Sequence, residues 1–181
     1  MRILAISGSL RGQSTNTSLL RAAQLVAPAS LEVVFYEQME TLPAFNPDLD
    51  LEPGPESVVR FRAELRSSDA VVFSTPEYAH GIPGSLKNAL DWVVGSGELS
   101  GKPVALMNAS ARGEYAQAAL REVLKTMDAR LVAEAEITVP LLGKGLREAE
   151  IASDAEFAAL IRSSLQTIAA VSEVNALKAR G

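Results

Sequence analysis

The sequence contains no cysteine and a single histidine, His80. The absence of cysteine excludes disulfide bonds, thiol nucleophiles and cysteine-ligated metals, and it is typical of proteins in a reducing compartment. A lone histidine cannot form the usual multi-histidine metal site, so we expect no metal. The His80 imidazole could have a structural role in its loop. It could instead donate a proton to a substrate, because an unperturbed imidazole titrates near neutral pH.

Aromatic residues make up only 5% of the chain, and 17 Lys and Arg stand against 22 Asp and Glu, for a formal net charge of −5. No basic cluster with interleaved aromatics occurs, so we expect no nucleic-acid partner. The first nine residues, MRILAISGS, contain one basic residue and an apolar run too short for a signal-peptide core or a membrane span. We therefore expect a cytoplasmic protein without a membrane partner.

With 181 residues, of which 48% are hydrophobic, the chain can bury a sizeable core as one domain over residues 1–181. Short apolar runs alternate with helical patterns. The runs predict strands at 2–6, 31–36, 69–74, 104–108 and 131–139. The helical patterns predict helices at 17–27, 55–67, 83–95, 115–127 and 154–179. We expect Pro83 at the first position of the third helix and a capping box from Ser153 to Glu156 at the start of the last.

Two of the expected strands are apolar at successive positions, in the segments 70–73 and 104–107, as in a parallel sheet covered by helices on both faces. Five strand–helix units predict an α/β fold, a doubly wound five-stranded parallel sheet of order 2-1-3-4-5. Ligands bind such sheets where the strand order reverses, beyond the carboxyl ends of strands 1 and 3. Three polar loops follow strands 1, 3 and 4, at residues 7–16, 75–84 and 109–114.

The first of these loops joins a buried strand to a helix start and carries four polar side chains and one guanidinium: Ser9, Arg11, Ser14, Thr15 and Asn16. A helix N-terminus attracts anions, and an arginine can add a bidentate pair to a phosphate. Neither the G-x-G-x-x-G turn of dinucleotide sites nor the P-loop spacing occurs, which favours a terminal monophosphate. The alternative is a turn whose Ser and Asn side chains only cap the helix.

Several motifs together resemble the NADPH-dependent FMN reductase family, which includes flavodoxin-like quinone, chromate and azo-dye reductases. The motifs are Gly8-Ser-Leu-Arg11 with Ser14 and Asn16, Thr75-Pro-Glu-Tyr78, Ile82-Pro-Gly84, Leu86-Lys-Asn-Ala-Leu-Asp-Trp92 and Gly101-Lys-Pro-Val104. The resemblance implies a flavodoxin-like fold, bound FMN, and two-electron transfer by hydride from NADPH through FMN to quinone-like or other electrophilic acceptors. It also implies assembly as a homodimer or homotetramer.

Carried over by position, the resemblance gives site residues in all three loops. Ser9, Arg11, Ser14 and Asn16 would hold the FMN phosphate, with Thr15 beside them. Pro76, Glu77, Tyr78 and Ala79 would border the flavin ring, and Ser110 would begin the third wall. Family members often have Asn where this chain has Ala79, and the third loop is shorter and more charged than usual, which leaves the role of Arg112 open. We expect no catalytic side chain, because the flavin carries the chemistry.

Two other functions stay open. One is a flavodoxin-type FMN electron carrier without direct NAD(P)H oxidation, against which Arg11, the modest acidity and the few aromatics argue. The other is a non-catalytic protein of the same fold. The helix at 83–95 offers more apolar surface than one stripe facing its own sheet requires. We therefore expect some of this surface, which Leu86, Ala89, Leu90, Trp92 and Val93 provide, to face a second subunit, whose 42–55 loop would reach over the flavin, with Lys87 and Asp91 at the contact. The alternative is that Trp92 and its neighbours pack inside one subunit, with Lys87 and Asp91 in solvent.

Overall fold

The sheet of this computed structural model, which describes residues 1–178, has the predicted strand order. Its strands are β1 (Arg2–Ser7), β2 (Glu32–Phe35), β3 (Ala70–Ser74), β4 (Pro103–Asn108), β5 (Arg130–Leu131) and β6 (Ile137–Thr138). The order is β2-β1-β3-β4-β5, with β6 also on β4, and every pairing is parallel. The doubly wound, flavodoxin-like topology expected from the sequence is confirmed.

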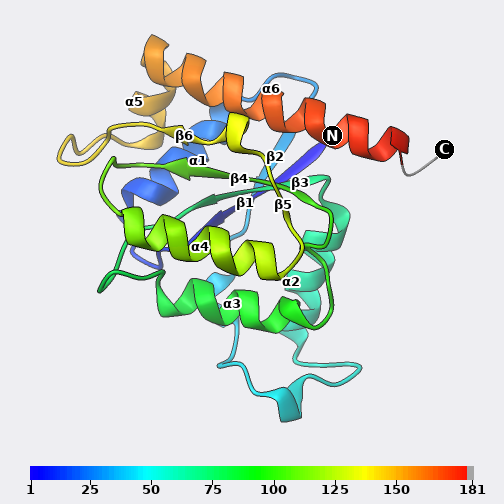
Figure 1. Ribbon diagram of the computed structural model, residues 1–181. Helices are drawn as coiled ribbons and strands as arrows, with labels where there is room; N and C mark the ends of the chain where they lie inside the picture. The colour runs from blue at the N-terminus through cyan, green and yellow to red at the C-terminus, as the bar shows by residue number, and fades with distance from the viewer. Residues whose placement is uncertain (179–181) are drawn as a thin grey trace.

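Helices cover both faces of this sheet (Figure 1). They are α1 (Thr15–Val26), α2 (Glu56–Ser67), α3 (Gly84–Val94), α4 (Glu114–Thr126), α5 (Glu148–Ser153) and α6 (Ala155–Lys178), with 3-10 turns at Met39–Thr41, Pro47–Leu49 and Ala133–Ala135. Helices α1, α5 and α6 lie on one face, and α2, α3 and α4 lie on the other. No helix in residues 1–178 is long and apolar enough to cross a membrane.

The two helix layers explain why the central strands are apolar at every position. In β1, Ile3 and Ala5 pack into the core under α1 and α6, whereas Leu4 and Ile6 pack into the core under α2 and α3. All four side chains are fully buried. Strands covered on both faces have no polar side, which is the pattern read from the sequence.

The expected strand at 131–139 is wrong. The segment pairs with β4 in two short pieces, β5 and β6, separated by the 3-10 turn Ala133–Ala135. Alanine and glutamate have low strand propensity, and the turn takes the chain off the sheet before Val139 N donates to Asn108 O at 2.7 Å. The apolar run therefore predicted correctly that this segment pairs with β4 but did not predict its interruption.

Two details of the helix starts are also wrong. Asp154, not Ser153, caps α6, because its Oδ1 accepts the N–H groups of Glu156 and Phe157 at 3.0 Å each. Pro83 precedes the first residue of α3 instead of beginning the helix. The short α5 was not expected, and the predicted helix end at residue 179 lies outside the described residues.

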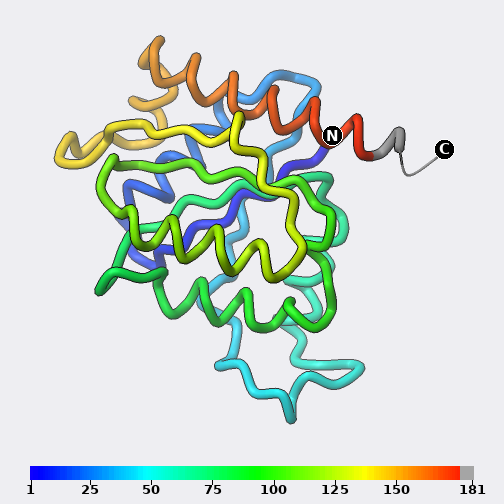
Figure 2. Tube along the Cα trace, viewed as in Figure 1, coloured from blue at the N-terminus to red at the C-terminus, as the bar shows by residue number. Residues whose placement is uncertain are grey.

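The predicted apolar surplus on α3 is buried inside the chain. Leu86, Ala89, Leu90, Trp92 and Val93 are each 1% exposed or less. The chain's own segment 42–55, which projects away from the helix layers (Figure 2), covers this face. Trp92 Nε1 donates to Pro43 O at 2.8 Å, and the ring meets Phe45 edge-on with centroids 5.0 Å apart. The expectation that these side chains face a second subunit is wrong.

Asn88 of α3 holds the same segment, whereas in the described part of the chain Lys87 and Asp91 do not contact it through an ion pair or hydrogen bond. Asn88 donates to Pro43 O at 2.9 Å and accepts the N–H of Phe45 at 2.7 Å. Lys87 and Asp91 form an ion pair along the helix surface, with Nζ and Oδ1 2.5 Å apart. These two side chains therefore satisfy each other within one helix.

Candidate functional site

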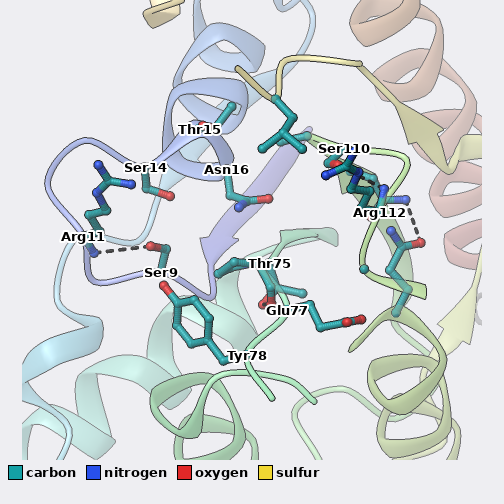
Figure 3. A pocket seen from close by; sticks show the side chains of 16 residues that line it. Ser9, Arg11, Ser14, Thr15, Asn16, Thr75, Glu77, Tyr78, Ser110 and Arg112 are labelled. Carbon is teal, nitrogen blue, oxygen red and sulfur yellow. Dashed lines mark hydrogen bonds between the residues drawn. The ribbon is translucent and has the colours of Figure 1, made fainter. Parts of the chain in front are cut away.

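A cavity of about 390 Å³ lies at the carboxyl ends of β1, β3 and β4, where the strand order reverses. The three polar loops singled out in the sequence form its walls (Figure 3). Its lining includes nine of the ten residues predicted for the site: Ser9, Arg11, Ser14, Thr15, Asn16, Pro76, Glu77, Tyr78 and Ser110. Ala79 is the one that does not line it.

Gly8 allows the first and second loops to meet. Its N–H donates to Ser74 O at 2.9 Å, directly after β1 and β3 end. A Cβ atom at this position would lie 2.2 Å from Thr75 Oγ1 and 2.8 Å from Thr75 Cβ, closer than real side chains approach. Only glycine therefore lets the backbone of the first loop lie against the second.

The side chains at the start of α1 are oriented by bonds that use their acceptor atoms. Ser14 Oγ accepts the N–H of Thr17 at 3.4 Å, so this serine does cap the helix. Its hydroxyl proton stays available for a ligand. Asn16 Oδ1 accepts from Ser74 Oγ at 2.9 Å, which leaves the amide nitrogen as a donor. The N–H groups of the first helical turn have no intrahelical acceptors. The two interpretations of this turn, capping and anion binding, are thus compatible.

Arg11 adds positive charge to this set. Its guanidinium forms no ion pair with any residue between 1 and 178, and its backbone N–H donates to Ser9 Oγ at 3.3 Å. Hydroxyls, an amide N–H₂, free backbone N–H groups and a guanidinium together make a donor set that suits a phosphate ester. The residues present therefore fit the phosphate of FMN.

The second loop closes in a tight turn at Tyr78–Gly81. These two residues exchange N–H···O bonds of 3.0 Å in both directions. Ala79 and His80 between them have φ of +50° and +58°. A turn with two positive-φ residues is usually built from Asn and Gly, because other side chains are strained there. Ala79 lies at the tip of this turn, which explains why it does not line the cavity.

Two contacts fasten the second loop to α4. Glu77 Oε2 accepts the N–H of Ala116 at 2.9 Å, in the first turn of the helix. The N-cap of α4 is Gly113, which has no side chain to accept that bond. The His80 ring stacks on the Tyr115 ring, with centroids 4.3 Å apart and planes 16° from parallel. Glu77 therefore works as the missing cap and holds two walls of the cavity together.

The third wall comes from β4 and α4. Asn108 Nδ2 donates to Gln117 Oε1 at 2.9 Å, and Ser110 Oγ accepts the N–H of Arg112 at 3.0 Å. Leu142 reaches the cavity because Leu141 N donates to Ala109 O at 3.1 Å, which carries the chain after β6 along the end of β4.

The lining residues that the sequence prediction did not include are Thr75, Asn108, Ala109, Arg112, Gly113, Gln117 and Leu142. The sequence pattern could have indicated Asn108, because it is a polar residue at the end of an apolar strand. No sequence pattern indicated that Leu142 would line the cavity.

Comparison with known proteins identifies the family. The model of the NADPH-dependent FMN reductase family matches residues 1–141. A quinone reductase from Pseudomonas putida is 42% identical over 132 residues, which cover 70% of each chain. An NAD(P)H-dependent FMN reductase from Pseudomonas aeruginosa is 36% identical over 145 residues, 77% of each chain.

The chain belongs to the NADPH-dependent FMN reductase family.

A solved structure agrees with this assignment. The flavoenzyme NAD(P)H:(acceptor) oxidoreductase FerB from Paracoccus denitrificans superposes with a TM-score of 0.76 at 29% identity, covering 92% of this chain and 96% of that one. The family resemblance read from the motifs is confirmed, and so is the expected class of flavin-dependent, NAD(P)H-oxidising reductase. In this FMN reductase, the polar loops lie at the carboxyl edge of the sheet.

Proposed function

We propose that this FMN reductase takes a hydride from NADPH and passes two electrons through bound FMN to quinone-like or other small electrophilic acceptors. The observation that carries the proposal is the cavity at the strand-order reversal, where a donor-rich turn on α1 meets two further loops. The curated relatives named as quinone reductases support this acceptor class. Residues 1–181 would form one reductase domain.

The first loop would hold the FMN phosphate. Ser9, Arg11, Ser14 and Asn16 present donors to one end of the cavity, with Thr15 beside them. Hydrogen bonds to a charged group contribute roughly 1.5–3 kcal/mol each, so several such donors hold a dianionic phosphate firmly.

The second and third loops would border the flavin ring, through Pro76, Glu77, Tyr78 and Ser110. When bound, FMN accepts and delivers hydride at N5, and the protein supplies binding and orientation. The contribution of this chain is rigidity: the bond from Ala116 N–H to Glu77 and the stack of His80 on Tyr115 fix the second loop against α4. Correct orientation of the reactants can lower the barrier by about 7–11 kcal/mol.

One anaerobic experiment tests the proposal. Purified protein is loaded with FMN, freed of excess flavin, and titrated with NADPH while the flavin absorbance is followed. We expect full bleaching with one equivalent of NADPH and recovery of the absorbance when a quinone is added. Bound flavin that NADPH does not bleach would indicate the electron-carrier function instead. A protein that binds no flavin would refute both.

We also propose a homodimer or homotetramer, and a cytoplasmic location. Because the apolar face of α3 is buried within the chain, the support for an oligomer comes from other exposed apolar side chains. Leu49 and Leu51 in the projecting segment 42–55 are 47% and 64% exposed, and Val94 at the end of α3 is 52% exposed. Arg62 holds the base of that segment through an ion pair with Asp50 of 2.8 Å. Sedimentation of the FMN-loaded protein measures the oligomeric state, and a single species at 19.2 kDa would exclude the oligomer.

A further inference from the structure

In the part of the chain that the structure describes, carboxylates hold six arginines, whereas three arginines at the carboxyl edge of the sheet have no carboxylate partner. Ion pairs hold Arg2, Arg21, Arg60, Arg62, Arg66 and Arg121. Within residues 1–178, no carboxylate pairs with Arg11, Arg112 or Arg147, and all three line cavities at this edge. A guanidinium beside a cavity and without a protein partner is available to an anionic ligand.

Arg147 lines a second cavity, of about 400 Å³, which we name the outer cavity. It adjoins the proposed flavin cavity, because Arg11, Ser14, Thr15 and Leu142 line both. The lining of the outer cavity includes two arginines and neither aspartate nor glutamate. Arg147 also lines a neighbouring hollow, which includes Arg11, Arg21 and the carboxylates of Glu37, Glu40 and Glu148. In the FMN-loaded protein Arg11 would face the flavin phosphate, so Arg147 is the cation of this lining that is left for a second anionic ligand.

The loop between β6 and α5 carries two basic side chains, Lys144 and Arg147, which lie in different surroundings. Gly143 and Gly145 have φ of +78° and +66°, and Lys144 between them places its ammonium 4.8 Å from the Phe157 ring centroid. The Arg147 backbone is fixed by its N–H bond to Glu150 Oε2 of 2.9 Å. Arg147 therefore has a fixed backbone, lines the outer cavity and forms no ion pair within the described residues, whereas Lys144 is engaged by an aromatic ring.

The occupant of the outer cavity follows from size and charge, and this step rests on the proposed function. The flavin cavity, at about 390 Å³, has room for roughly one small ligand. NADPH must bring its nicotinamide to the flavin, so its adenosine half has to lie outside that cavity. NADPH differs from NADH by a 2′-phosphate on that half. We propose that Arg147 binds the 2′-phosphate of NADPH in the outer cavity and thereby selects NADPH over NADH.

Steady-state kinetics of the FMN-loaded protein with each nucleotide test this assignment. We expect Arg147→Gln to raise the KM for NADPH about 10- to 100-fold, the loss of a charge-assisted pair, with kcat and the KM for NADH unchanged. Arg147→Lys keeps the charge without the bidentate geometry, so its KM for NADPH should lie between those of the wild type and Arg147→Gln. Lys144→Gln removes the same charge from the same loop and serves as the matched control, with both KM values within about twofold of wild type, because Lys144 does not line the cavity.

Calorimetry gives a readout that does not depend on turnover. The FMN-loaded wild type should bind adenosine 2′,5′-bisphosphate about 10- to 100-fold more tightly than AMP, and Arg147→Gln should bind the two equally. Equal effects on NADPH and NADH, or equal effects of Arg147→Gln and Lys144→Gln, would overturn the proposal. Weakened FMN affinity in Arg147→Gln would assign this arginine to the flavin phosphate instead. If neither nucleotide reduces the flavin, the proposed function fails, while the bisphosphate titration still decides the role of Arg147.

Discussion

Replacing Glu77 tests whether the second loop of the site is fastened to α4 as the structure shows. Glu77→Ala removes the acceptor of the Ala116 N–H, and Gly113 at the N-cap cannot replace it. Loss of an N-cap side chain costs about 0.5–2 kcal/mol. Part of that comes from the negative charge at the positive end of the helix dipole, typically 0.3–1 kcal/mol. We therefore expect Glu77→Ala to lower the free energy of unfolding by about 0.5–2 kcal/mol.

Glu77→Gln separates the hydrogen bond from the charge. Its amide oxygen can still accept from Ala116, so the loss should stay below about 1 kcal/mol. Urea denaturation of the flavin-free protein measures both variants without a contribution from FMN binding. Glu122→Ala, which removes an exposed carboxylate from the same helix, is the control. If Glu77→Ala unfolds at the same urea concentration as Glu122→Ala, the cap does not form in solution and the proposed rigidity of the second loop is wrong.

Four further outcomes are expected. Arg11→Ala should weaken FMN binding by about 1.5–3 kcal/mol in a folded protein, and unchanged affinity in a fluorescence titration would remove Arg11 from the phosphate site. Initial rates with varied NADPH and quinone should give parallel double-reciprocal lines, because one cavity serves both substrates; intersecting lines would show a ternary complex. Ala79→Gly should raise the free energy of unfolding by about 1 kcal/mol, since glycine relieves the positive φ at the turn tip; no gain in thermal denaturation would contradict this. Burial raises the pKa of Tyr36 to about 12, and its hydroxyl has no partner within the described residues. The unfolded chain releases this proton near its ordinary pKa of 10, so the wild type should lose stability as the pH rises from 10 to 12. Tyr36→Phe should be about 1 kcal/mol more stable at pH 7 and should lack this alkaline loss; equal pH profiles would refute the buried hydroxyl.

Local patterns predicted the layers of the fold and the first wall of the site. The apolar runs of β1, β3 and β4 have no polar face, which requires helices on both sides. The turn from Ser9 to Asn16 follows β1 directly. Its position at the carboxyl edge of the sheet can therefore be predicted once the strand order is known. The second wall of the cavity and Ser110 were predicted from the family motifs.

The interrupted edge of the sheet shows where local patterns fail. The apolar run at 131–139 predicted one continuous strand, yet the segment pairs with β4 only on either side of the 3-10 turn at Ala133–Ala135. Helix α5 has only six residues, too few for a helix to be stable alone. It exists through its packing on α1 and α6 and the bond from Arg147 N to Glu150.

The chemistry that meets at the carboxyl edge of the sheet follows from sequence patterns alone, because strand periodicity and the residues that follow each strand are local properties. Tertiary contacts select which segment covers α3, place Glu77 at the start of a helix far along the chain, and bring Leu142 to the flavin cavity and Arg147 to the outer cavity. These contacts join residues distant in sequence, such as Trp92 with Pro43 and Glu77 with Ala116. Side-chain pattern specifies that an apolar face must be buried or a helix end capped, but it does not specify by which part of the chain, since many segments satisfy the same need.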